Sequence, residues 1–129
     1  MPTNTNMTIY NKYTNPETKN VVYKKHIIDN VFWDDSINVN SNQGYENADK
    51  VNVFIPKDKN DMSRYVDSKH YNGNDWTLQN GDFMIKGYCP FEEINGIKDL
   101  ADYNVFRITV IDDKDFGSVN MQHFELRGN

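Results

Sequence analysis

Apolar and polar residues alternate along most of the chain, and this period of two is typical of half-buried β-strands. Val51, Val53 and Ile55 fall on one face of such a segment, which Pro56 ends. The strongest single strand is predicted over residues 105–111. Further strands are predicted over 8–13, 21–28, 31–40, 76–78, 83–85 and 122–127, with a hairpin or bulge at Asp29-Asn30 and a bend within 31–40.

Asn80-Gly81 lies between two runs of strand-forming residues, 76–78 and 83–85. Both residues tolerate positive φ, which a two-residue type I′ turn requires. The sequence therefore predicts a tight hairpin centred on this dipeptide.

Helical spacing is confined to residues 90–103, where Ile94, Ile97 and Leu100 or Ala101 share one face and predict about two turns of helix. Residues 57–75 carry charges of both signs and end in the turn cluster 72–75. A connection of this length is uncommon in a compact domain and is usually functional or mobile.

The fold class predicted from these elements is all-β: a small β-barrel or sandwich of about seven to eight strands with one short helix and one long loop. A chain of 129 residues has the size of one domain, which we expect over 8–129. Residues 1–7 are expected to form a flexible N-terminal arm. The predicted core includes Phe83, Ile85, Phe106, Ile108 and Val110, on facing strands.

Charge and cysteine content restrict the function classes. Nineteen acidic residues exceed fourteen basic ones, giving a net charge of −5, and this balance argues against a duplex-binding surface. The single cysteine, Cys89, excludes an intramolecular disulfide and is expected to be a buried apolar residue. No apolar run reaches the length of a membrane span and the N-terminus lacks a signal peptide, so synthesis in the cytoplasm and no membrane contact are expected.

The sequence predicts no catalytic, cofactor or metal site. Asp113 to Gly117 resembles a calcium loop, but the alternating acidic ligands stop after two and the glycine comes one residue early. His26, His70 and His123 share no ligand spacing. A solvated turn and unliganded histidines are the better interpretations, and we do not expect an enzyme.

Aromatic residues make up 13% of the chain, including eight tyrosines, which are too many to be all buried in a small domain. Tyrosine is enriched at protein interfaces because it offers a large, stiff contact area with a polar tip. Tyrosines therefore favour an assembly protein, although a carbohydrate-binding module uses the same surface aromatics. The candidate interface aromatics are Tyr10, Tyr13, Tyr65 and Tyr71.

The long connection is the other candidate functional segment. In an oligomeric ring it would either project into the central channel as a gate or clasp a neighbouring subunit, and a disordered surface loop is the alternative. Its candidate residues are Lys57, Lys59, Asp61, Arg64, Asp67 and Lys69.

Several motifs, taken together, resemble a family of small phage proteins encoded beside the head–tail connector genes of long-tailed phages of low-GC Gram-positive bacteria. They cover the domain from Thr8 to Asn129. The strongest are W-T-L-Q-N-G-D-F-M-I-K-G at 76–87 and H-F-E-L-R-G at 123–128, supported by M-T-I-Y-N-K-Y at 7–13, V-N-V-F-I-P at 51–56 and D-L-A-D-Y-N-V-F-R-I-T-V at 99–110.

The resemblance implies a small β-barrel that acts as a head-completion or stopper protein at the head–tail junction of the virion. Such a protein would form a ring under the portal-adaptor complex, retain packaged DNA and offer a surface to the tail. Its implied partners are the connector ring, tail terminator or tail tube proteins and further copies of itself, with channel DNA nearby. A tail terminator or head–tail adaptor is the alternative within the same neck, and a sugar-binding module is the alternative of another class.

Overall fold

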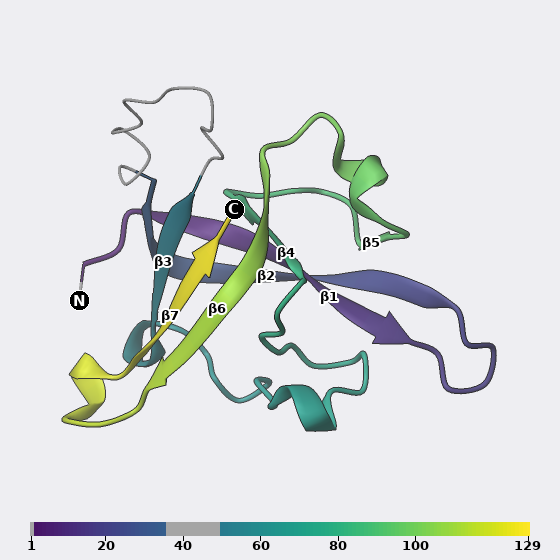
Figure 1. The fold of residues 1–129 in the computed structure, drawn as a ribbon. Helices are drawn as coiled ribbons and strands as arrows, with labels where there is room; N and C mark the ends of the chain where they lie inside the picture. Colours follow the sequence, from purple (N-terminus) through teal and green to yellow (C-terminus); the bar gives the residue numbers. More distant parts are fainter. Residues whose placement is uncertain (1, 36–49) are drawn as a thin grey trace.

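The structure is a computed structural model, and it describes residues 2–35 and 50–129. Within those residues the chain is built from antiparallel strands joined by turns, with single turns of 3-10 helix between some of them (Figure 1). The strands are β1 (Thr5–Thr14), β2 (Val21–Asp34), β3 (Val51–Pro56), β4 (Phe83–Lys86), β5 (Glu93–Ile94), β6 (Val105–Lys114) and β7 (His123–Gly128). The 3-10 turns are η2 (Lys57–Lys59), η3 (Ser68–His70), η4 (Ile97–Leu100) and η5 (Val119–Met121).

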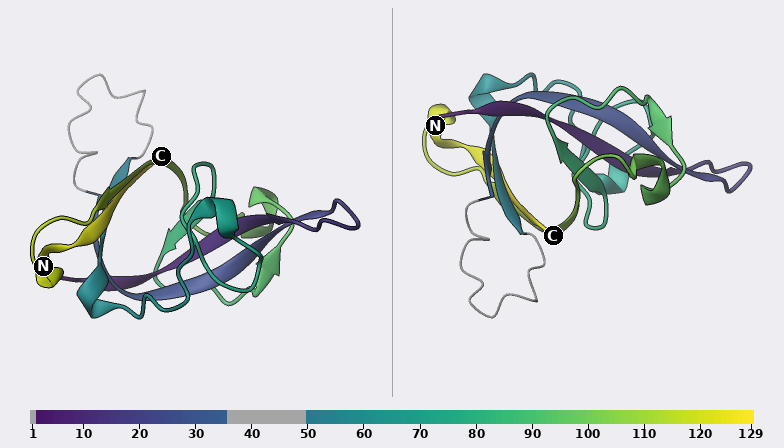
Figure 2. Two further views of the ribbon diagram at one scale, coloured as in Figure 1. Left: turned by 90° about the horizontal axis from the view of Figure 1, so that it is seen from below. Right: turned by 90° about the horizontal axis from the view of Figure 1, so that it is seen from above.

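The sheet closes on itself. The strand order is β1-β4-β6-β7-β3-β2-β5, and β1 also pairs with β2, so that six strands form a ring and β5 adds to the outside of β2. Figure 2 shows these strands curving around a common interior. The predicted all-β fold is confirmed, and closure removes the unpaired edges that an open sheet would expose.

Two hydrophobic clusters lie on opposite faces of the sheet. The first fills the barrel and draws on every strand of the ring, with Trp33, Trp76 and Phe124 among its largest members. The second lies between β1, β4 and the 87–104 segment and contains Tyr10, Phe83 and Ile85. Consequently β1 and β4 are buried on both faces, which explains the unbroken run of buried residues from Met7 to Asn11.

This second cluster corrects the predicted core. Phe83 and Ile85 are buried, but they point away from the barrel interior, and Met84 is the residue of β4 that enters it. Phe106 and Ile108 lie in the interior as predicted. Val110 does not, because the register between β6 and β7 shifts between Ile108 and Val110, and this bulge reverses the alternation beyond it.

The strand boundaries correct one further prediction and decide between the alternatives of another. β1 begins at Thr5 and Met7 is fully buried, so residues 5–7 belong to the barrel and not to an arm. β2 runs through Asp29-Asn30 without a break, and the predicted irregularity there is a bulge opposite the Thr5–Met7 stretch of β1. The strand predicted over 37–40 lies outside the described residues.

The Asn80-Gly81 hairpin prediction is wrong. Gly81 has φ 93° and Asp82 donates its backbone N–H to Gln79, but Asn80 does not have positive φ, which is the pattern of a type II turn. Residues 77–78 form no strand, and β4 pairs with β1 and β6 instead of with them. Trp76 and Leu78, the buried aromatic and aliphatic residues before the turn, pack into the core at one end of the barrel. No described strand pairs with 77–78 there.

The predicted helix over 90–103 is absent. Ile94 belongs to the short strand β5. Within 90–103 the helical part is the 3-10 turn η4, in which Leu100 is buried and Ile97 is exposed. The apolar spacing in this segment serves contact with the second cluster and not an amphipathic helix.

The bulge in β6 can be tested by comparing two substitutions. Phe106 contacts Trp33 edge-on, with 5.6 Å between ring centroids, so Phe106→Ala is expected to lower the free energy of unfolding by about 3–5 kcal/mol. Val110→Ala should cost less than about 1 kcal/mol, because that side chain is 38% exposed. Urea titrations of both variants would measure the difference, and equal losses would contradict the shifted register.

Gly128 offers a second test of the barrel seam. A Cβ at this position would lie 2.4 Å from Met84 Cε and 3.0 Å from the backbone oxygen of Arg107. Gly128→Ala is therefore expected to cost about 1–3 kcal/mol through overpacking. Gly96→Ala is the matched control, since nothing lies within 4 Å of the place that a Cβ would take there. Thermal melts in which the two variants match wild type would refute close packing of β7 on β4 and β6.

Candidate functional site

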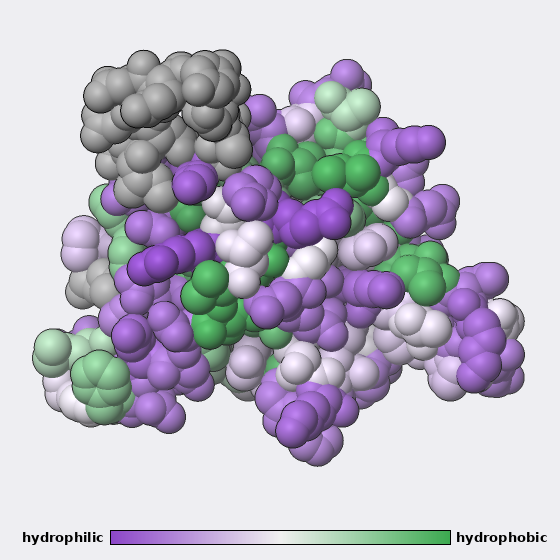
Figure 3. Space-filling view, in the orientation of Figure 1, coloured by the Kyte–Doolittle hydropathy of each residue, from purple (hydrophilic) through white to green (hydrophobic). Residues whose placement is uncertain are grey.

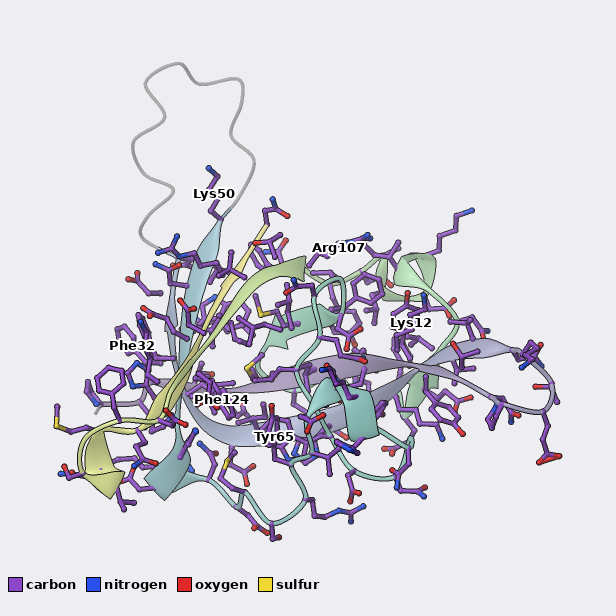
Figure 4. The ribbon with its side chains drawn as sticks, turned by 60° about the horizontal axis from the view of Figure 1, so that its bottom comes forward. Lys12, Phe32, Lys50, Tyr65, Arg107 and Phe124 are labelled. Atoms are coloured by element: carbon purple, nitrogen blue, oxygen red, sulfur yellow. The ribbon has the colours of Figure 1, made fainter. Side chains whose placement is uncertain are left out.

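The long connection lies against its own barrel. Tyr65 lies beside Phe124, with ring centroids 5.0 Å apart (Figure 4). Its ring also contacts Trp76 at 5.0 Å between centroids, and Met62 packs on the same core. Tyr65 and Trp76 also form an isolated parallel bridge. Contacts of this kind place the 62–76 part of the connection against one end of the barrel.

Four of the six predicted charged residues take partners inside the chain. Lys57 Nζ lies 2.6 Å from Asp113 Oδ1 and over the Phe124 ring, which joins η2 to the β6–β7 hairpin. Arg64 pairs with Asp75 at 3.3 Å and also donates to the carbonyl of Asn74.

The two remaining partnered residues are carboxylates that organise turns. Asp67 lies 2.9 Å from His70 Nδ1 and also accepts from the backbone N–H of Lys69, contacts that lower the pKa of its carboxyl. Asp61 accepts from Ser63, and its pKa is also lowered by these hydrogen bonds. The structure thus spreads the six predicted residues along the barrel end and does not gather them into one site, and their role between subunits stays a prediction.

The four candidate interface tyrosines divide into three environments. Tyr10 is fully buried and donates its hydroxyl to the Phe91 carbonyl at 2.7 Å, so its prediction as an interface residue is wrong. Its position among the outward-facing residues of β1 is covered by the 87–104 segment, which sequence alternation could not reveal. Tyr65 is half-buried by its contacts with Trp76 and Phe124. Tyr13 and Tyr71 are half-buried and form an edge-to-face pair, with 6.2 Å between centroids.

The Tyr13–Tyr71 pair borders a surface pocket of about 320 Å³ that sequence analysis did not predict. The pocket joins the last residues of β1, next to the β1–β2 turn, to the segments at 68–71 and 79–82. Its lining combines aromatic, amide, hydroxyl and charged groups: Lys12, Tyr13, Thr14, Ser68, Tyr71, Gln79, Asn80 and Asp82.

Asp82 is the buried group at this pocket, with only 2% of its surface exposed. One carboxylate oxygen accepts from the backbone N–H of Lys12 at 3.1 Å, and the other accepts from the Asn11 and Gln79 side-chain amides at 2.9 and 2.8 Å. Burial raises the pKa of this carboxyl, and the three donors partly oppose that effect. The Asp82 charge, after burial itself, helps to raise the pKa of Tyr71 to about 12.

Asn11 extends this network into the barrel end. Its side chain exchanges two hydrogen bonds with the backbone of Thr77, at 2.8 and 3.1 Å, and both residues are fully buried. Together Asn11 and Asp82 hold the irregular 76–82 segment where a strand ladder would otherwise satisfy its backbone. The arrangement is therefore a structural clamp whose outer side forms the wall of the pocket.

His26 forms a second partly buried polar site on the other side of the long connection. Its ring stacks on Trp76, with centroids 4.9 Å apart and an 8° interplanar angle. Burial, together with the nearby Arg64 charge, lowers the pKa of His26. The neutral imidazole is therefore the form that the folded protein favours.

Among the large apolar residues that the structure describes, the most exposed lie at the turn between β6 and β7. Phe116, Val119 and Met121 are 71%, 66% and 64% exposed. Figure 3 shows hydrophobic residues on this lower-left projection, next to hydrophilic surface over β6 and β7. The sequence predicts only a solvated turn at the start of this segment. The spacing of Phe116, Val119 and Met121 matches neither the period of a strand nor that of a helix, so it predicts no further element.

Metal binding and membrane insertion find no support among the described residues. Residues 2–35 and 50–129 contain no group of three or more His, Cys, Asp or Glu side chains placed to hold a metal ion. None of the helices in these ranges is long and apolar enough to cross a membrane. Cys89 is buried, as its sequence context predicts.

Asp82 can be tested as a structural clamp. Asp82→Ala leaves three N–H donors without their acceptor and is expected to cost about 2–4 kcal/mol of stability. Asp115→Ala, at an exposed acidic position, is the control and should change stability by less than about 0.5 kcal/mol. Chemical denaturation of both variants is the measurement, and a neutral Asp82→Ala would show that the network contributes nothing.

His26 predicts a pH dependence. Because the folded state lowers the pKa of His26, the unfolded chain binds a proton more readily, and the stability that His26 contributes is present above about pH 6.5 and lost as the pH falls below it. His26→Phe keeps a ring against Trp76 and removes the titration. Denaturation midpoints at pH 7.5 and 5.0 should fall more for wild type than for this variant, and identical falls would contradict the assignment.

No curated protein and no solved structure matches the chain. A family model does match, over residues 2–129, which is nearly the whole sequence and includes every described strand. The chain therefore belongs to the family of unknown function DUF6751.

Proposed function

We propose that this protein is a structural component of a phage head–tail junction, where copies form a ring under the portal-adaptor complex, retain packaged DNA and provide a surface for tail attachment. The proposal starts from the sequence motifs that resemble head-completion proteins. The closed antiparallel barrel has the architecture that this resemblance implies.

The observation that carries the proposal is the apolar turn between β6 and β7. Three large apolar side chains, each more than 60% exposed, stand on a turn that the chain holds by its own hydrogen bonds. Exposed apolar groups that are held in place are unfavourable in water and are typical of a surface that another protein covers. An assembly protein makes use of such a turn, whereas a free-standing domain does not need it.

A carbohydrate-binding module is the second candidate, because of the pocket beside Tyr13 and Tyr71. Aromatic rings next to amide and carboxylate groups are suited to a polar ring-shaped ligand. Two features weaken this alternative: Asp82 already accepts three hydrogen bonds, and the Tyr13 ring lies against Gly73 on one side with Lys24 Nζ 5.3 Å from its centroid. Binding on a glycan array, abolished by Tyr71→Ala, would favour the module over the neck protein.

The head–tail assignment can be tested in the phage or prophage that carries the gene. Deleting the gene is expected to give DNA-leaking or tailless heads together with free tails, seen by electron microscopy, and peptides of the protein should be found in purified wild-type particles. Complementation with Phe116→Ser/Met121→Ser should restore assembly poorly, with a loss of infectious particles of about tenfold or more, because the turn loses its apolar contact.

Ile97→Ser is the matched control for this double substitution, since Ile97 is also an exposed apolar residue, on η4. It is expected to complement fully. Normal infectious particles from the deletion strain, without any complementing copy, would refute the proposed role.

A further inference from the structure

Two projections leave the barrel at opposite ends. The β1–β2 hairpin extends beyond the strands that pair with it on one side, and the β6–β7 turn with η5 lies on the other, in both Figure 1 and Figure 2. Their charges are opposite. Residues 12–25 contain four lysines and one glutamate, whereas residues 112–125 contain four acidic residues and one lysine.

The β6–β7 end carries acidic side chains that have no cationic partner within residues 2–35 and 50–129. Asp112 and Glu125 are direct cross-strand partners, a like-charge pair that is unfavourable within the sheet. Asp113 pairs with Lys57, but Asp112, Asp115 and Glu125 form no ion pair with any described residue. An approaching cationic surface would relieve this repulsion.

The apolar turn stands beside these carboxylates and is ordered. Met121 donates its backbone N–H to Ser118, and the Gln122 side chain donates to the Gly117 carbonyl. Gly117 has φ 84°, which the turn requires. Phe116, Val119 and Met121 are thereby presented on a preformed acidic projection, which lowers the entropy cost of docking.

The β1–β2 end has the complementary properties. Its turn is closed by Asn15, whose side chain accepts from the backbone N–H groups of Glu17 and Thr18, and by Lys19 at φ 64°. Lys24 and Lys25 pair with Glu93 and Glu92, so the positive charge that remains for a contact comes from Lys12 and Lys19, and Glu17 in the same turn offsets part of it. Exposed apolar side chains are present at Val21, which follows the turn of this hairpin, and at Tyr88 and Phe91, on the segment that covers β1 and β2.

We infer that the acidic apolar β6–β7 turn of one copy docks against the basic β1–β2 hairpin of a second copy. Because two different surfaces meet, the contact is heterologous, and repeating it closes a ring when the rotation between copies allows. The inference rests on the proposed function, for which it specifies the direction of the lateral contact. Charge attraction gives the orientation and the apolar turn gives the buried area.

A charge-exchange experiment on the purified protein tests this contact. The turn variant Asp112→Lys/Asp115→Lys and the hairpin variant Lys19→Glu/Asn20→Asp should each weaken self-association by about tenfold or more, measured by analytical ultracentrifugation up to high protein concentration in low salt. An equimolar mixture of the two variants should recover association, because the altered turn of one now meets the altered hairpin of the other. Wild-type association should also weaken as salt is raised.

The control is Asp29→Lys/Asp102→Lys, which changes the net charge by the same amount as the turn variant, at exposed positions on neither projection. It should associate like wild type, and melting curves should show that all variants fold. Association that is absent in wild type under every condition, unchanged in the turn variant, or not recovered in the mixture would overturn the inference.

This experiment needs no virion, so its result is separate from the test of the head–tail role. Recovery in the mixture together with normal particles from the gene deletion would keep the contact and reject the role. Tailless heads from the deletion, with no recovery in the mixture, would keep the role and reject this contact.

Discussion

Pairing of β1 with both β2 and β4 is the constraint on which the rest of the structure depends. Without the β1–β2 ladder the sheet would remain open, with β1 at one edge and β2 next to the other. Closure buries Met7 and Ile9 inside the barrel, while the covering segment 87–104 buries Tyr10 on the outer face. A strand buried on both faces cannot display amphipathic alternation, and the polar groups that it does bury, such as Asn11, must be bonded internally.

The need to bond buried polar groups such as Asn11 internally connects barrel closure with the irregular 76–82 segment at one end of the barrel. Asn11 and Asp82 satisfy backbone groups of 76–82 and of Lys12 that no strand ladder satisfies, and Tyr65 packs the long connection onto the same end through Trp76. A buried carboxylate at this position costs desolvation, which is why its pKa is raised, but its three donors fix one geometry for the turn. The desolvation of Asp82 therefore lowers the stability of the fold, whereas its hydrogen bonds hold the pocket wall in one arrangement.

The elements that the sequence predicts correctly are those whose evidence is local. Alternation located β3, β6 and β7, and Asp29-Asn30 was recognised as an irregularity. Local evidence fails where tertiary contacts override local signals: Asn80-Gly81 forms a turn without a hairpin, because the residues before it are used by the core, and Val110 changes sides because of a bulge that only pairing with β7 reveals. The pocket and the clamp around Asp82 join residues about 70 positions apart, a distance at which one sequence carries no pairing information.

The surface properties follow from the same closure. Closure pairs each strand of the six-strand ring with two neighbours and leaves only the two-residue strand β5 at an edge among the described residues, so the β1–β2 and β6–β7 hairpins, which project beyond the ring, are the larger surfaces for association. The acid excess of the whole chain gives mutual repulsion that is screened beyond about 8 Å at physiological salt, whereas the opposite charges of the two hairpins act at contact distance. Free copies should therefore meet productively in one orientation only, and a template that holds them side by side would raise their effective concentration enough for a weak contact to suffice.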